Sequence, residues 1–166
     1  MIIKARRGLA SLALVGLVAA CSHSALAGAP PVVRSALDPF ISAGYACQAH
    51  PPDVSGYAQW QCDGTSSDGS VNSVILDASQ SAVVNVLATS HRTAAPATGP
   101  DGAGAFFDRV TDIPLGVSVS TIKDWVNGNL MRDGQAQFGP VFVTLEIRPP
   151  LTTLNLFASP DRTAPP

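Results

Sequence analysis

Apolar and polar residues alternate with a period of two in several parts of the chain, and this pattern predicts β-strands. The clearest example lies at 138–147, where Val141, Val143 and Leu145 alternate with Phe142 and Thr144. Valine and isoleucine favour strands because their branched side chains pack well on a pleated surface. Similar patterns predict five further strands, at 44–50, 57–63, 71–77, 83–89 and 151–158.

Three other stretches carry the spacing of helices. The first, at 32–43, is expected to break at Pro39, because proline suits the first turn of a helix better than its interior. The second, at 101–112, ends before Pro114. The third begins near Ser118 or Ser120, either of which can cap it. It carries an apolar stripe made of Ile122, Trp125, Val126 and Leu130.

The expected order is therefore one helix, four strands, two helices and two strands. Because strands and helices are segregated along the chain, the pattern favours an α+β fold. We expect an antiparallel sheet of about six strands with two or three helices on one face. Residues 32–159 are predicted to form a single domain, followed by a frayed tail at 160–166.

The N-terminus has the layout of an export signal. Lys4, Arg6 and Arg7 precede the apolar run Leu9–Ala20, and small residues follow it. The run is shorter than the about 20 apolar residues that a membrane-spanning helix needs. Residues 1–20 are therefore interpreted as a signal peptide that directs the chain out of the cytoplasm.

Two cleavage sites compete at the end of this signal. The segment Val18–Cys21 (VAAC) resembles the lipobox of small bacterial exported lipoproteins. The resemblance implies that Cys21 becomes the lipidated first residue, which would anchor the protein to the cell membrane or outer membrane through a flexible tether at 21–31. The alternative is the A-x-A site Ala25–Ala27, where cleavage before Gly28 would release a periplasmic or secreted protein.

Either route removes Cys21 as a free thiol and leaves Cys47 and Cys62. An even pair of cysteines in an oxidising compartment indicates a disulfide. If the strands at 44–50 and 57–63 pair as a hairpin, these two residues lie nearly opposite each other. The spacing thus predicts one disulfide that staples the hairpin.

Charge limits the classes of partner. Only 13% of the residues are charged, about half the usual fraction. Removal of Lys4, Arg6 and Arg7 leaves seven Lys and Arg against twelve Asp and Glu, a net charge of about −5. A chain without a basic patch is a poor ligand for phosphate backbones, so nucleic acid is excluded as the expected partner.

No combination of residues predicts catalysis, a metal or a cofactor. Cys47, His50 and Cys62 supply three potential zinc ligands, but zinc usually takes four, and exported cysteines oxidise more readily than they bind metal. A Ser-His-Asp triad would have to use His50 or His91, and neither lies in a recognisable motif. Glu146 is expected at a solvated strand position, and 63–69 at a hairpin turn rather than a calcium loop.

Aromatic residues offer the remaining candidates for a functional surface. Tyr57, Trp60 and Phe142 are the candidate interaction residues, although Trp60 shares a predicted face with Cys62 and burial against the disulfide is the alternative. The leading hypothesis is a lipid-anchored, non-enzymatic domain that binds a protein or a cell-wall component. The alternatives are an enzyme inhibitor that inserts the loops at 51–56 and 91–104, and a small hydrolase without a recognisable motif.

Overall fold

The structure is a computed structural model that describes residues 26, 28–52, 56–92 and 101–159. The predicted signal peptide, Cys21 and the predicted tail lie outside these residues. The elements are α1 (Pro31–Ser42), β1 (Ala46–His50), β2 (Ala58–Thr65), β3 (Val71–Ala78), β4 (Val83–His91), α2 (Asp101–Thr111), α3 (Val119–Asn129), β5 (Gly134–Phe138), β6 (Val141–Arg148) and β7 (Leu151–Ala158).

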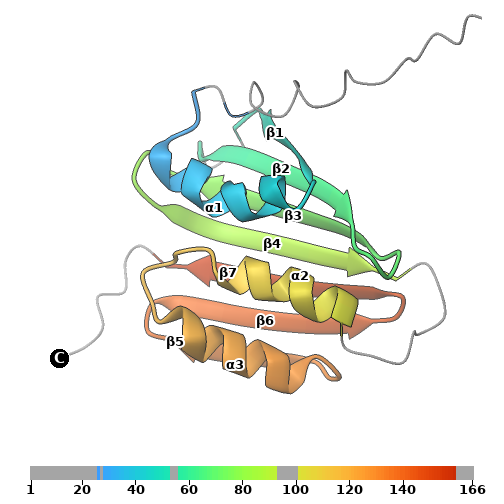
Figure 1. Ribbon diagram of the computed structural model, residues 1–166. Coiled ribbons are helices and arrows are strands. Elements are labelled where there is room, and N and C mark those ends of the chain that lie inside the picture. The colour runs from blue at the N-terminus through green and yellow to red at the C-terminus, as the bar shows by residue number, and fades with distance from the viewer. Residues whose placement is uncertain (1–25, 27, 53–55, 93–100, 160–166) are drawn as a thin grey trace, which may run out of the picture.

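All the strands join one antiparallel sheet of seven, in the order β1-β2-β3-β4-β7-β6-β5. The chain builds this sheet in two halves. The first half runs inward from β1 to β4, and the second half runs inward from β5 to β7 (Figure 1). The last strands of the two halves, β4 and β7, pair at the centre, so the earliest strand of each half forms an edge.

One face of the sheet, which we call the inner face, is apolar and buried. Its side chains are 0 to 9% exposed, and they alternate along each strand with more exposed residues. This is the period-two pattern of a sheet that packs on one side. The inner face includes Cys47, Trp60, Cys62, Val74, Leu76, Val86, Ala88, Val143, Leu145, Leu154 and Leu156.

The inner face shares a single core with the buried residues of the helices. In Figure 1 the three helices cross in front of the sheet, with α1 beside β1 and β2, α2 beside β4, and α3 beside β5 and β6. Aromatic rings fill the space under α1 and α2, where Tyr45 stacks on Phe106 with ring centroids 6.1 Å apart. The helices contribute Val33, Leu37, Phe40, Phe106, Phe107, Val110, Ile122 and Val126 to this core.

The prediction of about six strands was one strand short. The sequence pattern placed a single strand at 138–147, whereas β5 and β6 are separate strands joined by a tight turn. Gly139 has a φ of +57° in that turn, a conformation that glycine adopts without strain. β5 has the sequence GQAQF, which lacks the branched residues that usually mark a strand.

The predicted break at Pro39 was also wrong, because α1 continues through this residue. Proline has no N–H group, so the carbonyl of Ser35 loses its usual helical partner. Burial of Val33, Leu37 and Phe40 on one side of the helix outweighs this loss, because packing supplies most of the stability of a short helix.

The predicted disulfide is present and joins β1 to β2. Cys47 lies opposite Cys62 in the strand register, and the two are covalently linked. Their loop spans 15 residues, so in the chain-entropy model the bond stabilises the fold by about 3 kcal/mol. A disulfide of this kind is typical of an oxidising, non-cytoplasmic compartment.

The predicted flexible tether at 21–31 is wrong over its C-terminal part. Leu26 is 8% exposed and Ala29 is 6% exposed, and both belong to the core. The helix α1 then begins at Pro31, within the predicted tether. Within the described part of the chain, no helix has the length and apolar character required to cross a membrane.

Candidate interaction surface

The face of the sheet opposite the core, which we call the outer face, brings together side chains from all seven strands. Strand register aligns them in rows. One row contains His50, Gln59, Asp77, Asn85, Phe157, Phe142 and Gln137, and the next contains Gln48, Gln61, Ile75, Leu87, Asn155, Thr144 and Gln135.

Amides and carboxylates hold one another in place on the β2–β4 side of the outer face. Asp77 accepts hydrogen bonds from Gln59 Nε2 and from Asn85 Nδ2, each at 2.9 Å. Gln61 Nε2 donates to both carboxylate oxygens of Asp63, at 2.9 and 3.0 Å. These groups are therefore fixed before any ligand arrives, and both oxygens of Asp77 are already occupied.

Apolar side chains occupy the middle of the outer face. Phe142 and Phe157 lie opposite each other on β6 and β7, and Phe157 is 45% exposed. Ile75 and Leu87 pair in the neighbouring row and are half-buried. A surface with an apolar centre and polar surroundings has the composition that protein interfaces favour.

A shallow pocket of about 300 Å³ lies at the β5–β6 side of the molecule. Its lining includes Gln135, Thr144 and Glu146, together with the ion pair between Asp133 and Arg148. The Ile147 amide, which donates to Asp133 at 2.7 Å, and the Arg148 guanidinium hold the pKa of Asp133 below its usual range. The hydrogen bond that Arg148 donates to Asp133 also raises the pKa of Arg148, so both members of this ion pair stay charged.

Glu146 is, like Asp133, an exposed acid of this pocket. Arg148, the cation in the lining of this pocket, pairs with Asp133, and no hydrogen bond of the Glu146 carboxylate occurs among the described residues. The pocket therefore presents the Glu146 carboxylate, which accepts no hydrogen bond from the described residues, beside the polar side chains of Gln135 and Thr144. Such an arrangement suits a cationic group from a ligand.

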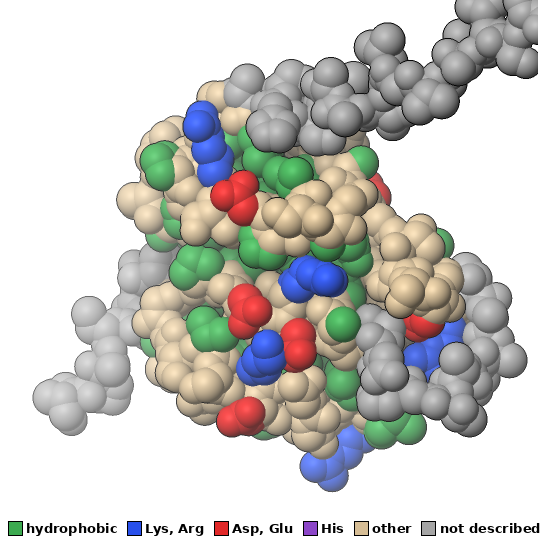
Figure 2. Space-filling model, viewed as in Figure 1, with side chains coloured by type: hydrophobic (Ala, Val, Ile, Leu, Met, Phe, Trp, Pro, Cys, Tyr) green, Lys and Arg blue, Asp and Glu red, His purple; other side chains and the backbone are tan. Residues whose placement is uncertain are grey.

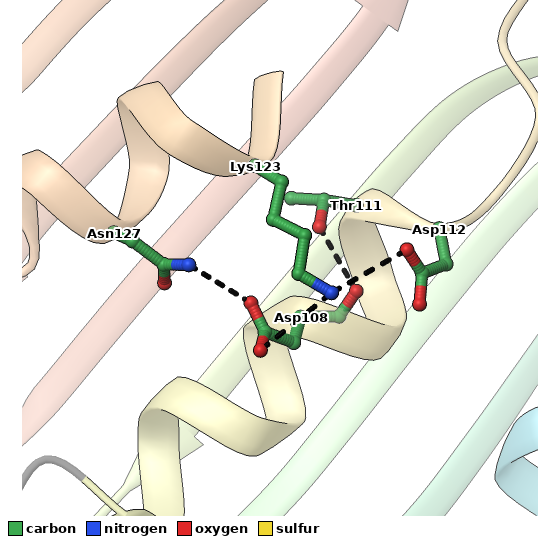
Figure 3. A network of polar contacts seen from close by, with 5 residues as sticks. All are labelled: Asp108, Thr111, Asp112, Lys123 and Asn127. Atoms are coloured by element: carbon green, nitrogen blue, oxygen red, sulfur yellow. Dashed lines mark hydrogen bonds and ion pairs between the residues drawn. The ribbon is translucent and has the colours of Figure 1, made fainter. Parts of the chain in front are cut away.

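A second polar cluster joins α2 to α3 and has a structural role (Figure 3). Lys123 lies 3.6 Å from both Asp108 and Asp112, and Asn127 donates to Asp108 at 3.1 Å. Thr111 donates to the backbone carbonyl of Asp108 at 2.9 Å. Every polar group here links one helix to the other or closes a turn, and ion pairs this exposed contribute little.

The candidate interaction residues are not all on one surface. Trp60 is 6% exposed on the inner face, on the same side of β2 as Cys62, so its assignment to the surface was wrong and the alternative of burial holds. Phe142 is half-buried on the outer face, and Tyr57 is half-buried just before β2. Sequence periodicity separates the two faces, but it did not reveal which of them the helices cover.

The candidate catalytic and metal residues are dispersed. His50 lies on the edge strand β1 beside Gln48, whereas His91 ends β4, which is three strands away. That separation is at least about 14 Å from strand spacing alone. The described residues contain no group of three or more His, Cys, Asp and Glu that would hold a metal ion.

The predicted turn at 63–69 is shorter than expected, because β2 extends to Thr65, and Asp68 holds the connection between β2 and β3. Its carboxylate accepts the backbone N–H and the hydroxyl of Ser70, each at 3.0 Å, as expected of a hairpin turn. Residues 53–55 and 93–100, which make up most of the loops suggested for an inhibitor, lie outside the described residues.

Comparison with known proteins gave no relative: no family model, no curated protein and no solved structure matches the chain at a significant level.

Proposed function

We propose that this chain is an exported, lipid-anchored, non-enzymatic binding domain, and that its outer face docks a protein partner with a basic surface. The observation that carries the proposal is the outer face itself. The helices gather over the inner face, which leaves the outer face without a described helix over it.

The dimensions of the outer face suit a protein interface. Seven strands at their usual spacing extend about 29 Å across, and strands of eight residues extend about 26 Å along the chain. The face therefore offers on the order of 700 Å², close to the about 800 Å² that each partner buries in an interface of standard size. Phe142, Phe157 and Leu87 supply the apolar centre that such an interface requires.

Charge complementarity identifies the kind of partner. Asp63, Asp77 and Glu146 are acids of the outer face, and the only Lys or Arg in the described strands is Arg148, which Asp133 engages. The helix side differs, because Figure 2 shows acidic and basic side chains close together there. An acidic face favours encounter with a basic partner and discriminates against an acidic one.

The hydrolase alternative has less support among the described residues. Both carboxylate oxygens of Asp77 and of Asp63 already accept hydrogen bonds, and the two histidines lie far apart. The disulfide supports the export part of the proposal. A lipid on Cys21 would supply the membrane attachment.

The test is photocrosslinking in the native host. A photoreactive amino acid replaces Thr144 on the outer face or, as the control, Asn127 on the exposed side of α3. We expect a discrete crosslinked protein from position 144 and none from position 127. Because the attraction is electrostatic, we expect the crosslink to decrease about tenfold or more when Glu146→Lys is added.

The matched control is Asp124→Lys, which reverses an exposed acid on α3 and should leave the crosslink unchanged. A crosslink that persists with Glu146→Lys but disappears with Asp124→Lys would place the binding surface on the helix side. Absence of any crosslink from the outer face would also contradict the proposal.

A further inference from the structure

The first described residues form a docked arm rather than a linker. Leu26 is 8% exposed and joins the same core cluster as α1. Its backbone carbonyl accepts the N–H of Ala29 at 3.0 Å. Arg34, on α1, donates from Nε to the carbonyl of Ala29 at 3.0 Å and fastens the other end of the arm.

The described residues Leu26 and Gly28 flank the second of the two candidate cleavage sites, which follows Ala27. Cleavage after Ala27 would remove Leu26 from the protein, together with its buried side chain and the carbonyl that holds Ala29. It would also create a charged α-amino group at Gly28, directly before the buried Ala29. The product would therefore lose part of its core and gain a charge beside the gap.

Cleavage at the first site has neither consequence. It leaves Leu26 inside the mature chain and places the new α-amino group five residues before it. We propose that the mature protein retains Leu26, because the leader is removed at the Ala20–Cys21 bond and not after Ala27. In this step water hydrolyses the peptide bond, leaving a carboxylate on Ala20 and an α-amino group on Cys21. The inference rests on the export of the chain proposed above.

The experiment is the intact mass of the mature protein, isolated from the membranes and the medium of the native host. The full-length gene is expressed as wild type and as Ala27→Leu, which removes the small residue that the A-x-A site needs. We expect both chains to begin at Cys21. The proposal would be overturned by a wild-type chain that begins at Gly28 together with an Ala27→Leu chain that no longer begins there.

Two further readouts complete the test. Thermal unfolding of the mature protein should show Leu26→Ala several degrees below wild type, whereas Leu151→Ala, at an exposed leucine, should be nearly unchanged. Equal melting temperatures would contradict a core role for Leu26. A full-length, uncleaved chain with Cys47 and Cys62 reduced would instead contradict export, and this outcome is distinct from a start at Gly28.

Discussion

The two edges of the sheet are secured in different ways. β1 is linked covalently to β2 by Cys47–Cys62, and α1 packs beside both strands. β5 has no covalent link, and it is held by packing of Trp125 against Phe138 and by the nearby Asp133–Arg148 pair. Both strands have five residues, so the two edges differ in how they are attached and not in strand length.

The difference follows from what each edge has available for burial. β1 places Cys47 on the inner face, beside Cys62 and Trp60, where an apolar disulfide fits. β5 has Gly134 at the matching position under Trp125, and a Cβ added there would come within 3.0 Å of the indole ring. The glycine lets the ring lie close to the strand. The first edge thus depends on oxidation, and the second depends on the packing of Trp125 together with the Asp133–Arg148 pair.

The largest expected effect is loss of the disulfide. Replacing Cys47 and Cys62 together by serine should destabilise the domain by about 3 kcal/mol and lower its melting temperature by roughly 10 °C. Thermal unfolding and amide hydrogen exchange measure this effect. Exchange should increase most in β1 and least in β5. An unchanged melting temperature would contradict a stabilising role for the bond.

Trp125→Ala should have the next largest effect, and it should act on the opposite edge. Trp125 is half-buried, so we expect about 2 kcal/mol, less than the about 3–5 kcal/mol of a fully buried tryptophan. Hydrogen exchange should increase in β5 and not in β1. Thr121→Ala, at an exposed position of α3, is the control. Equal exchange at both edges would show that the edges are not stabilised independently.

The smallest expected effect concerns pH and Asp133. Hydrogen bonding to the Ile147 amide and to Arg148 lowers the pKa of Asp133 below its ordinary value of 3.8. Because the pKa in the folded state lies below the ordinary value, the Asp133 carboxylate stabilises the β5–β6 edge at any pH above that ordinary value. This stabilisation is lost as the pH falls through the folded-state pKa. The amide chemical shift of Ile147 should follow this titration, and Asp133→Asn should abolish it.

The sequence predicted the elements whose residue types and spacing agree. The disulfide followed from the expected hairpin, because Cys47 and Cys62 lie nearly opposite each other across its loop, and the strand register pairs them directly. β5 was missed because glutamine and alanine carry little strand propensity, and its pairing with β6 depends on a turn at Gly139. Helix α1 was predicted to break because local rules about Pro39 do not include the burial of Phe40.

The outer face was only partly predictable. Alternation identifies which residues share one face of one strand, but the rows across the sheet depend on register. Asp77 contacts Gln59, 18 residues away, and Asn85, eight residues away, and neither spacing is a motif. A register shift next to Asp77 makes the alignment still harder to infer from sequence. The face is therefore a property of the assembled sheet.

The burial of Leu26 also limits the distance between the domain and its membrane anchor. If Cys21 carries the lipid, five residue steps separate the anchor from a side chain inside the core, and a fully extended chain of that length reaches about 17 Å. This maximum length of the connecting segment is shorter than the width of the domain's own sheet, about 29 Å. The domain would therefore stay next to the bilayer surface, and a partner would have to bind it there.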